Sequence, residues 1–192
     1  MNKLFFSVCA LCVSLSVSAQ SDVYFTSDLS NEGLMKIYHC LSKQAFGKVA
    51  LKISTGESSK TYYLRPEYIK PLVDETNATI VECNTAYGGN RATTAKHRAA
   101  IKERGFDQIA TVDIMDEEDT MRIPVVDTKH IQYNIVGSHL SQYDFMINLA
   151  HFKGHAMVGY GGVLKNASIG VASSRGKAYI HTAGYTSELN DM

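Results

Sequence analysis

The sequence lacks an excess of charge of either sign. It contains 19 basic and 19 acidic residues in a chain of 192. A protein that binds nucleic acid or an anionic membrane surface through its charge carries a basic excess or a basic stripe, and this chain shows no such pattern. The composition therefore argues against a nucleic-acid partner and against electrostatic attachment to a membrane.

Long apolar runs are also lacking, except at the N-terminus. Lys3 precedes an apolar stretch over residues 4–17, and Val17-Ser18-Ala19 follows as a small-residue cleavage pattern. The stretch is too short for a lasting membrane span, so the pattern predicts a secretory signal peptide over residues 1–19. An uncleaved anchor is the alternative. Cleavage removes Lys3 and leaves 18 basic against 19 acidic residues. We expect an exported protein, periplasmic or secreted, with no membrane attachment after cleavage.

Cysteine is scarce. Cys9 and Cys12 lie inside the predicted signal peptide, so the exported chain keeps Cys40 and Cys83. Two cysteines permit one disulfide, and export makes it chemically feasible. However, Cys83 ends an apolar run, which favours a buried free thiol.

The remaining residues, about 170, correspond to one domain. Residues 20–47 form an N-terminal segment in which Gly33 to Ser42 has helical spacing, and residues 48–192 form the main domain. No internal repeat or low-complexity segment is present.

Short apolar runs alternate with helical stretches in the main domain. The predicted strands cover residues 48–54, 79–83, 109–115 and 145–150, with a short edge strand over 121–126. The predicted helices begin at Pro66, with Pro71 as a kink or early end, and at Thr93 or Thr94, ending before Gly105. Residues 138–143 form a helical turn, and Lys177, Tyr179 and His181 alternate as on a surface strand. This order predicts an α/β fold with a mostly parallel sheet and helices on both faces.

Parallel sheets bind ligands beyond the carboxyl ends of their strands. After the run at Phe145, the chain carries basic residues, then glycines over 159–162, then Lys165 and Asn166. This is the layout of a ligand-binding βα loop. We expect a small-anion site in which Lys153 and Lys165 hold a carboxylate or phosphate, Asn166 assists, and Glu82 and Asn84 lie opposite. Ser54, Thr55 and Asp113 should share the same rim. The glycine spacing matches neither a dinucleotide fingerprint nor a phosphate loop, so a flexible turn is the alternative.

His151 and His155 are four residues apart. On a helix they would share a face and could bind a divalent metal, but Gly154 argues against a helix. Acid–base or anion-binding roles, and simple solvated histidines, stay open. The acidic run Asp116 to Asp119 lacks the regular spacing of a calcium loop, which favours a solvated loop.

Several segments together resemble one family. They are Val49-Ala50-Leu51-Lys52-Ile53, Val81-Glu82-Cys83-Asn84-Thr85-Ala86-Tyr87, His151-Phe152-Lys153-Gly154-His155 and Gly162-Val163-Leu164-Lys165-Asn166. They are similar to the bacterial domain of unknown function 362 family, from about Lys48 to Gly184. Relatives are often named iron–sulfur centre proteins, and many carry ferredoxin-type cysteine clusters further along the chain. The resemblance implies an α/β domain with a conjectural redox or metal-linked role. An iron–sulfur cluster or a divalent metal as cofactor is implied by the resemblance only, and no reaction comes with it.

The chain departs from this pattern in two ways. It stops at Met192, where relatives continue, and it has no cluster-type cysteine spacing of its own. A second hypothesis is therefore a non-catalytic truncated remnant or a partner subunit that needs a protein partner or a homo-oligomer to complete its sheet.

Overall fold

The computed structural model describes residues 21–57, 62–156 and 159–188. The predicted signal peptide lies outside these residues. Within them, no helix has the length and apolar character needed to cross a membrane.

The centre of the fold is a parallel sheet of four strands in the order β3-β2-β1-β6. They are β1 (Val49–Lys52), β2 (Thr79–Glu82), β3 (Val112–Ile114) and β6 (Phe145–Asn148). Leu51 at the centre of β1 aligns with Ile80 on one side and Ile147 on the other. The predicted α/β fold with a parallel sheet is confirmed. Because the chain moves outward from β1 to β3 and then returns to the other side of β1, the strand order reverses between β1 and β6. Such a reversal opens a crevice at the carboxyl ends of the strands.

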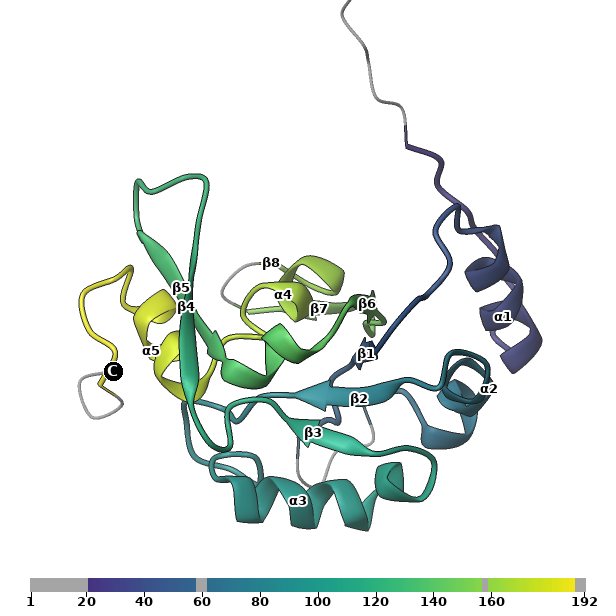
Figure 1. Cartoon of the computed structure of the whole chain (residues 1–192), viewed down its shortest axis with the longest axis horizontal. Helices are drawn as coiled ribbons and strands as arrows, with labels where there is room; N and C mark the ends of the chain where they lie inside the picture. The colour runs from purple at the N-terminus through teal and green to yellow at the C-terminus, as the bar shows by residue number, and fades with distance from the viewer. Residues whose placement is uncertain (1–20, 58–61, 157–158, 189–192) are drawn as a thin grey trace, which may run out of the picture.

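Three helices, α1 (Asn31–Cys40), α2 (Pro66–Thr76) and α3 (Thr94–Glu103), belong to one side of the sheet (Figure 1). Their apolar residues join those of the strands in one cluster, whose fully buried members include Leu51, Ile69, Ile80 and Phe106. Pro66 begins α2, as predicted, but the helix does not end at Pro71 and continues to Thr76. Gly105 follows α3 with a φ of 79°, the left-handed conformation predicted for the end of this helix, and a short 3₁₀ turn, η1 (Phe106–Gln108), leads to β3.

The other side carries a hairpin of β4 (Thr120–Pro124) and β5 (Tyr133–Gly137), followed by a 3₁₀ turn, η2 (Ser138–Gln142). A second apolar cluster lies here and contains Ala50, Val81, Met115, Val136 and Val171. The predicted strand over 121–126 is present, but its partner β5 was not predicted.

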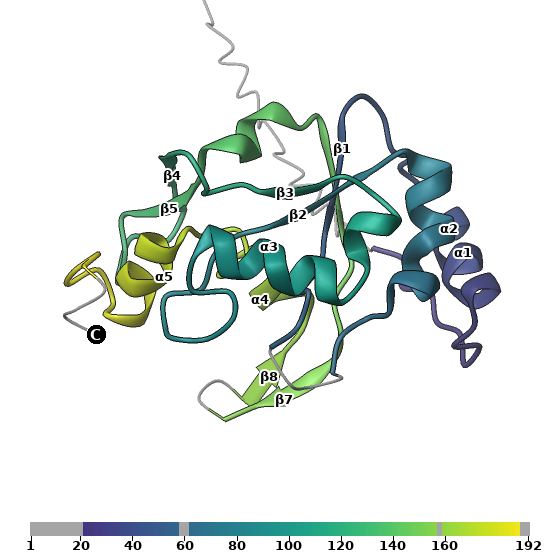
Figure 2. The ribbon, with the colours of Figure 1, turned by 90° about the horizontal axis from the view of Figure 1, so that it is seen from below.

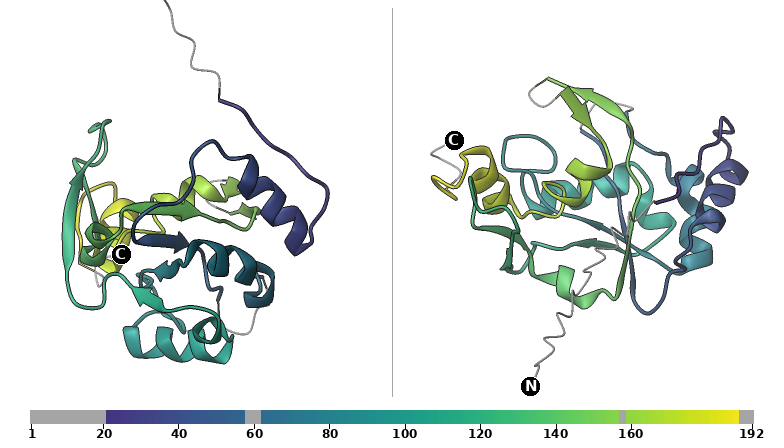
Figure 3. Two further views of the ribbon diagram at one scale, coloured as in Figure 1. Left: turned by 45° about the vertical axis from the view of Figure 1, so that its right-hand side comes forward. Right: turned by 90° about the horizontal axis from the view of Figure 1, so that it is seen from above.

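The C-terminal segment in which Lys177, Tyr179 and His181 alternate forms a helix, α5 (Ser174–His181), and not a surface strand. The hydroxyl of Ser173 accepts a hydrogen bond from the backbone N–H of Gly176 and begins the helix. Helix α5 packs against β5, at the end of the molecule opposite α1 and α2 (Figure 3). Lys177 is buried there, at 6% exposure, so the prediction of a surface position was wrong.

The predicted βα loop after β6 contains a small hairpin, β7 (Lys153–His155) and β8 (Gly159–Gly161), which projects beyond the sheet (Figure 2). A short helix, α4 (Val163–Ala167), follows it. The hairpin therefore holds Lys153 above the strand ends.

Both cysteines in the described residues are free thiols, Cys40 exposed and Cys83 buried. The preference for a buried free thiol at Cys83 is confirmed.

The contact between α5 and β5 leaves no room for a side chain at Gly176. A Cβ atom there would collide with the carbonyl oxygen of Ile135. We expect Gly176→Ala to destabilise the protein by roughly 1–3 kcal/mol and to lower the melting temperature by several degrees. The matched control is Gly154→Ala, because a Cβ at Gly154 meets no atom within 4 Å. Equal melting temperatures for the two variants, measured by circular dichroism, would contradict the packing described.

Candidate functional site

A cavity of about 170 Å³ lies at the carboxyl ends of β1, β2 and β6. The strand ends, the β7–β8 hairpin, α4 and α5 all contribute residues to it. Its charged lining residues are five cations and two carboxylates, namely Lys52, Arg91, Lys153, Lys165, Lys177, Glu57 and Glu82. The cavity therefore lies at the crevice expected from the strand order, and most of its charged lining residues are cations.

A buried ion pair forms the floor of this cavity. Lys52 Nζ lies 2.8 Å from Glu82 Oε2, and the two side chains are only 1% and 3% exposed. Lys52 Nζ also donates to the side-chain oxygen of Asn166 at 3.0 Å. In return, Asn166 Nδ2 donates to the carbonyl of Lys52 at 2.9 Å and to Asn148 Oδ1 at 2.7 Å. Asn166 thereby ties α4 to both β1 and β6.

The second oxygen of Glu82 is equally well satisfied. It accepts from the backbone N–H of Thr55 at 2.7 Å, from the Thr55 hydroxyl at 3.1 Å and from Arg91 Nη1 at 3.0 Å. Burial alone would raise the pKa of Glu82, but the positive charges of Lys52 and Arg91 outweigh it and hold this pKa far below its usual value. Glu82 is thus a fixed negative charge. Arg91 uses its other nitrogen, Nη2, to pair with Glu57.

His97 on α3 completes the buried network. Its Nδ1 lies 3.2 Å from Asn84 Oδ1, and its Nε2 lies 3.3 Å from the Thr55 hydroxyl. Burial lowers the pKa of His97 to about 4, so the imidazole is neutral near pH 7. His97 therefore acts as a hydrogen-bonded support for Thr55 and Asn84.

Lys177 of α5 reaches the cavity from the other side. Its Nζ donates to the carbonyl of Asn84 at 2.8 Å and to the carbonyl of Ala172. Burial lowers the pKa of Lys177. Beside it, Cys83 Sγ donates to the carbonyl of Val171 at 3.2 Å, and burial raises the pKa of this thiol to about 12. The thiol is thus protonated and not a nucleophile.

Lys153 and Lys165 differ from these buried cations. No ion pair joins either of them to a carboxylate within the described part of the chain. Lys165 Nζ contacts His155 Nε2, and burial, together with the nearby charge of Lys153, lowers the pKa of Lys165. Two of the cations, Lys52 and Arg91, are balanced by the two carboxylates, Glu57 and Glu82. Lys153, Lys165 and Lys177 therefore leave a positive excess in the cavity.

The structure brings most of the predicted site residues together. Glu82, His151, Lys153, Lys165 and Asn166 all line the cavity. The side chain of Asn84, by contrast, is turned to His97 and Thr94.

His155 lies at the edge of the site, in contact with Lys165. His151 and His155 do not share a helix, since His155 belongs to β7 and His151 precedes it. Their metal-binding role stays a prediction.

Asp113 was expected on the same rim, but it lies away from the cavity, within β3. Its carboxylate is held by His139 and Tyr143. The outward step of the chain from β2 to β3 is the reason, because β3 is two strands away from the reversal between β1 and β6.

Four members of the site were not predicted from the sequence: Lys52, Arg91, His97 and Lys177. Lys52 did carry a signal, since it is the charged residue within the apolar strand Val49 to Ile53, and a lysine buried in a strand requires a partner. The other three come from a loop and from helices, and only the tertiary fold brings them to the strand ends.

Removal of Lys52 should expose the cost of a buried, unpaired carboxylate. We expect Lys52→Met to destabilise the protein by about 3–5 kcal/mol, and Lys52→Met/Glu82→Gln to recover a large part of this loss. The matched control is Lys70→Met in the exposed Lys70–Asp74 pair, with an effect below about 1 kcal/mol. Urea unfolding measures all three. A single Lys52→Met variant as stable as the control would show that the pair does not support the fold.

His97 gives the stability a distinct pH dependence. The pKa of His97 is 6.5 in the unfolded reference and about 4 in the fold, so the unfolded state binds more protons between these values. The free energy of unfolding should therefore fall by up to about 3 kcal/mol as the pH drops from about 6.5 to about 4. Glu82 affects the free energy of unfolding in a lower pH range. Its lowered pKa changes the stability only below about pH 4.5, where the unfolded state begins to bind the proton.

Urea unfolding at several pH values tests this contribution. We expect His97→Gln to flatten the slope between pH 6.5 and 4.5, whereas the control His39→Gln, on the surface, keeps it. An unchanged slope in His97→Gln would mean that another group carries the effect.

Comparison with known families identifies one match. The model of the family described as a domain of unknown function (DUF362) matches residues 49–192. No curated protein and no solved structure matches the chain.

Proposed function

The chain belongs to the DUF362 family, and we propose that it binds a small carboxylate or phosphate in the cavity between β1, β2 and β6. The observation that carries this proposal is the positive excess of the cavity. The two cations Lys52 and Arg91 are balanced by Glu57 and Glu82, and the three lysines Lys153, Lys165 and Lys177 remain. A ligand with one or two negative charges would neutralise this excess.

The size of the cavity supports a small ligand. Its volume of about 170 Å³ is below the range of about 300–1,000 Å³ that is usual for drug-sized molecules. The two ends of the cavity differ in rigidity. The floor is rigid, because Lys52, Glu82 and Asn166 hold one another. The roof consists of the β7–β8 hairpin, from which Lys153 can adjust its long side chain to the ligand. We infer that the floor orients the ligand and that the roof holds its charge.

Because the sequence predicts a signal peptide, we propose that binding takes place outside the cytoplasm, in the periplasm or the medium. The metal role of His151 and His155 is the less favoured alternative, because His155 Nε2 is engaged by Lys165. For a metal to bind there, this contact would have to break.

The iron–sulfur cluster implied by the family resemblance does not fit the cysteines of the described residues. Clusters are held by several cysteine thiolates. Cys40 is exposed on α1, whereas Cys83 is a buried, protonated thiol that donates to Val171. We therefore derive no redox step from these residues.

Anion binding can be tested by isothermal titration of the purified protein with inorganic phosphate and with small mono- and dicarboxylates. At least one of these anions should bind, and binding should weaken as salt is added. Lys153→Met and Lys165→Met should each weaken binding by about tenfold or more, because a hydrogen bond to a charged group contributes about 1.5–3 kcal/mol. The melting temperature should change little.

The matched control is Lys129→Met, which removes an exposed lysine between β4 and β5. If Lys153→Met and Lys165→Met bind as the control does, or if no anion of the set binds, the proposal is wrong. A large loss of melting temperature in both variants would show instead that the two lysines support the fold.

A further inference from the structure

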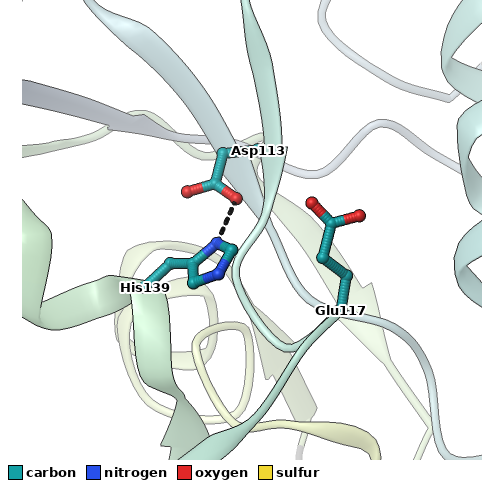
Figure 4. A group of neighbouring side chains, drawn as sticks. All are labelled: Asp113, Glu117 and His139. Carbon is teal, nitrogen blue, oxygen red and sulfur yellow. Dashed lines mark hydrogen bonds and ion pairs between the residues drawn. The ribbon is translucent and has the colours of Figure 1, made fainter.

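We propose that Asp113, Glu117 and His139 form a second site, which binds a divalent transition-metal ion at the edge of the sheet. The three residues come from β3, from the turn after it and from η2. The site is separate from the anion cavity, because none of the three lines it. Figure 4 shows the three side chains grouped around the end of β3.

The donor atoms are close enough for one ion. One ligand atom from each residue can be chosen so that all three lie within 4.8 Å of one another. Metal–ligand bonds to carboxylate oxygen and imidazole nitrogen are about 2.0–2.2 Å long, so two donors on one ion stand at most about 4.4 Å apart. A shift of less than about 1 Å at the side chains would complete the geometry.

Residues outside the group already contact both carboxylates. Tyr143 Oη donates to Asp113 Oδ2 at 2.7 Å, and this leaves Oδ1 directed at His139 Nδ1, 2.8 Å away. Arg98 donates to both oxygens of Glu117, with Nη2 2.6 Å from Oε1. An outer hydrogen bond such as that of Tyr143 orients the ligand of a metal site, whereas the Arg98 pair competes with an ion for Glu117. On binding, the ion would replace the hydrogen bond between Asp113 and His139.

The local charge favours a cation. The side chains of Asp113 and His139 are 13% and 14% exposed, and Glu118 Oε2 approaches His139 Nε2 at 3.5 Å. The three carboxylates and Arg98 together carry an excess of two negative charges. This is opposite in sign to the cavity at β1 and β6, and it matches the charge of a divalent ion.

The chemistry of the donors narrows the ion. Calcium and magnesium prefer six or more oxygen ligands. A mixture of imidazole and carboxylate suits Zn²⁺ or Mn²⁺. Bound there, the ion would link the turn after β3 to η2 and so stabilise the free edge of the sheet.

Arg98 provides the sharpest test. Because its guanidinium competes with a cation for Glu117, Arg98→Gln should bind the ion more tightly than the original protein. Asp113→Asn and Glu117→Gln should bind it at least about tenfold more weakly. The matched control is Asp74→Asn, which removes an equal charge from α2, outside the proposed site. This variant should bind the ion as tightly as the original protein.

The protein is treated with EDTA, dialysed, and titrated with Zn²⁺ by calorimetry and with Mn²⁺ by electron paramagnetic resonance. Circular dichroism confirms that each variant is folded. Binding of one ion per chain, weakened in Asp113→Asn and strengthened in Arg98→Gln, is the expected result.

Three outcomes would overturn the proposal. The first is no binding of either ion up to a concentration of about 1 mM, which corresponds to about −4 kcal/mol. The second is equal affinity in Asp113→Asn and Asp74→Asn. The third is loss of binding in His151→Gln or His155→Gln with normal binding in Asp113→Asn, which would place the ion at the anion cavity.

Discussion

The ion pair of Lys52 and Glu82 is the interaction on which the site depends. Two charges buried at the ends of neighbouring strands are costly unless each has a full set of partners, and here three of the partners come from three different segments of the chain. Thr55, Arg91 and Asn166 supply them from the loop after β1, the loop after β2 and helix α4. The pair therefore couples the folding of these segments to the sheet. It also keeps a charged, polar surface at the one place where the strand order opens a crevice.

The difference between paired and unpaired cations around the cavity follows from the position of the Lys52–Glu82 pair. The buried cations closest to the sheet are matched by carboxylates, whereas the lysines of the hairpin and α4 have none among the described residues. A protein that needed only stability would gain little from unpaired lysines around a cavity, because like charges repel one another. We propose that a ligand brings the missing negative charge.

Much of the sheet could be predicted from the sequence, because β1, β2 and β6 are apolar runs bounded by polar or glycine residues. Lys153 and Lys165 could be placed at the site for the same reason, since they follow the end of a strand. Lys177 could not, because its alternation with Tyr179 and His181 matches a strand, whereas the Ser173 cap and the packing of α5 on β5 make the segment helical. Arg91 and His97 also gave no local signal. Their roles arise from contacts with Glu82 and Asn84, which exist only in the folded chain.

The central claim is that the cavity receives an anion through its unpaired lysines while the buried pair stays intact. A crystal structure of the protein with phosphate tests this most directly. We expect a phosphate within hydrogen-bonding distance of Lys153 and Lys165, with Lys52 and Glu82 still paired. A cavity that contains only water at saturating phosphate, or a phosphate bound elsewhere, would contradict it.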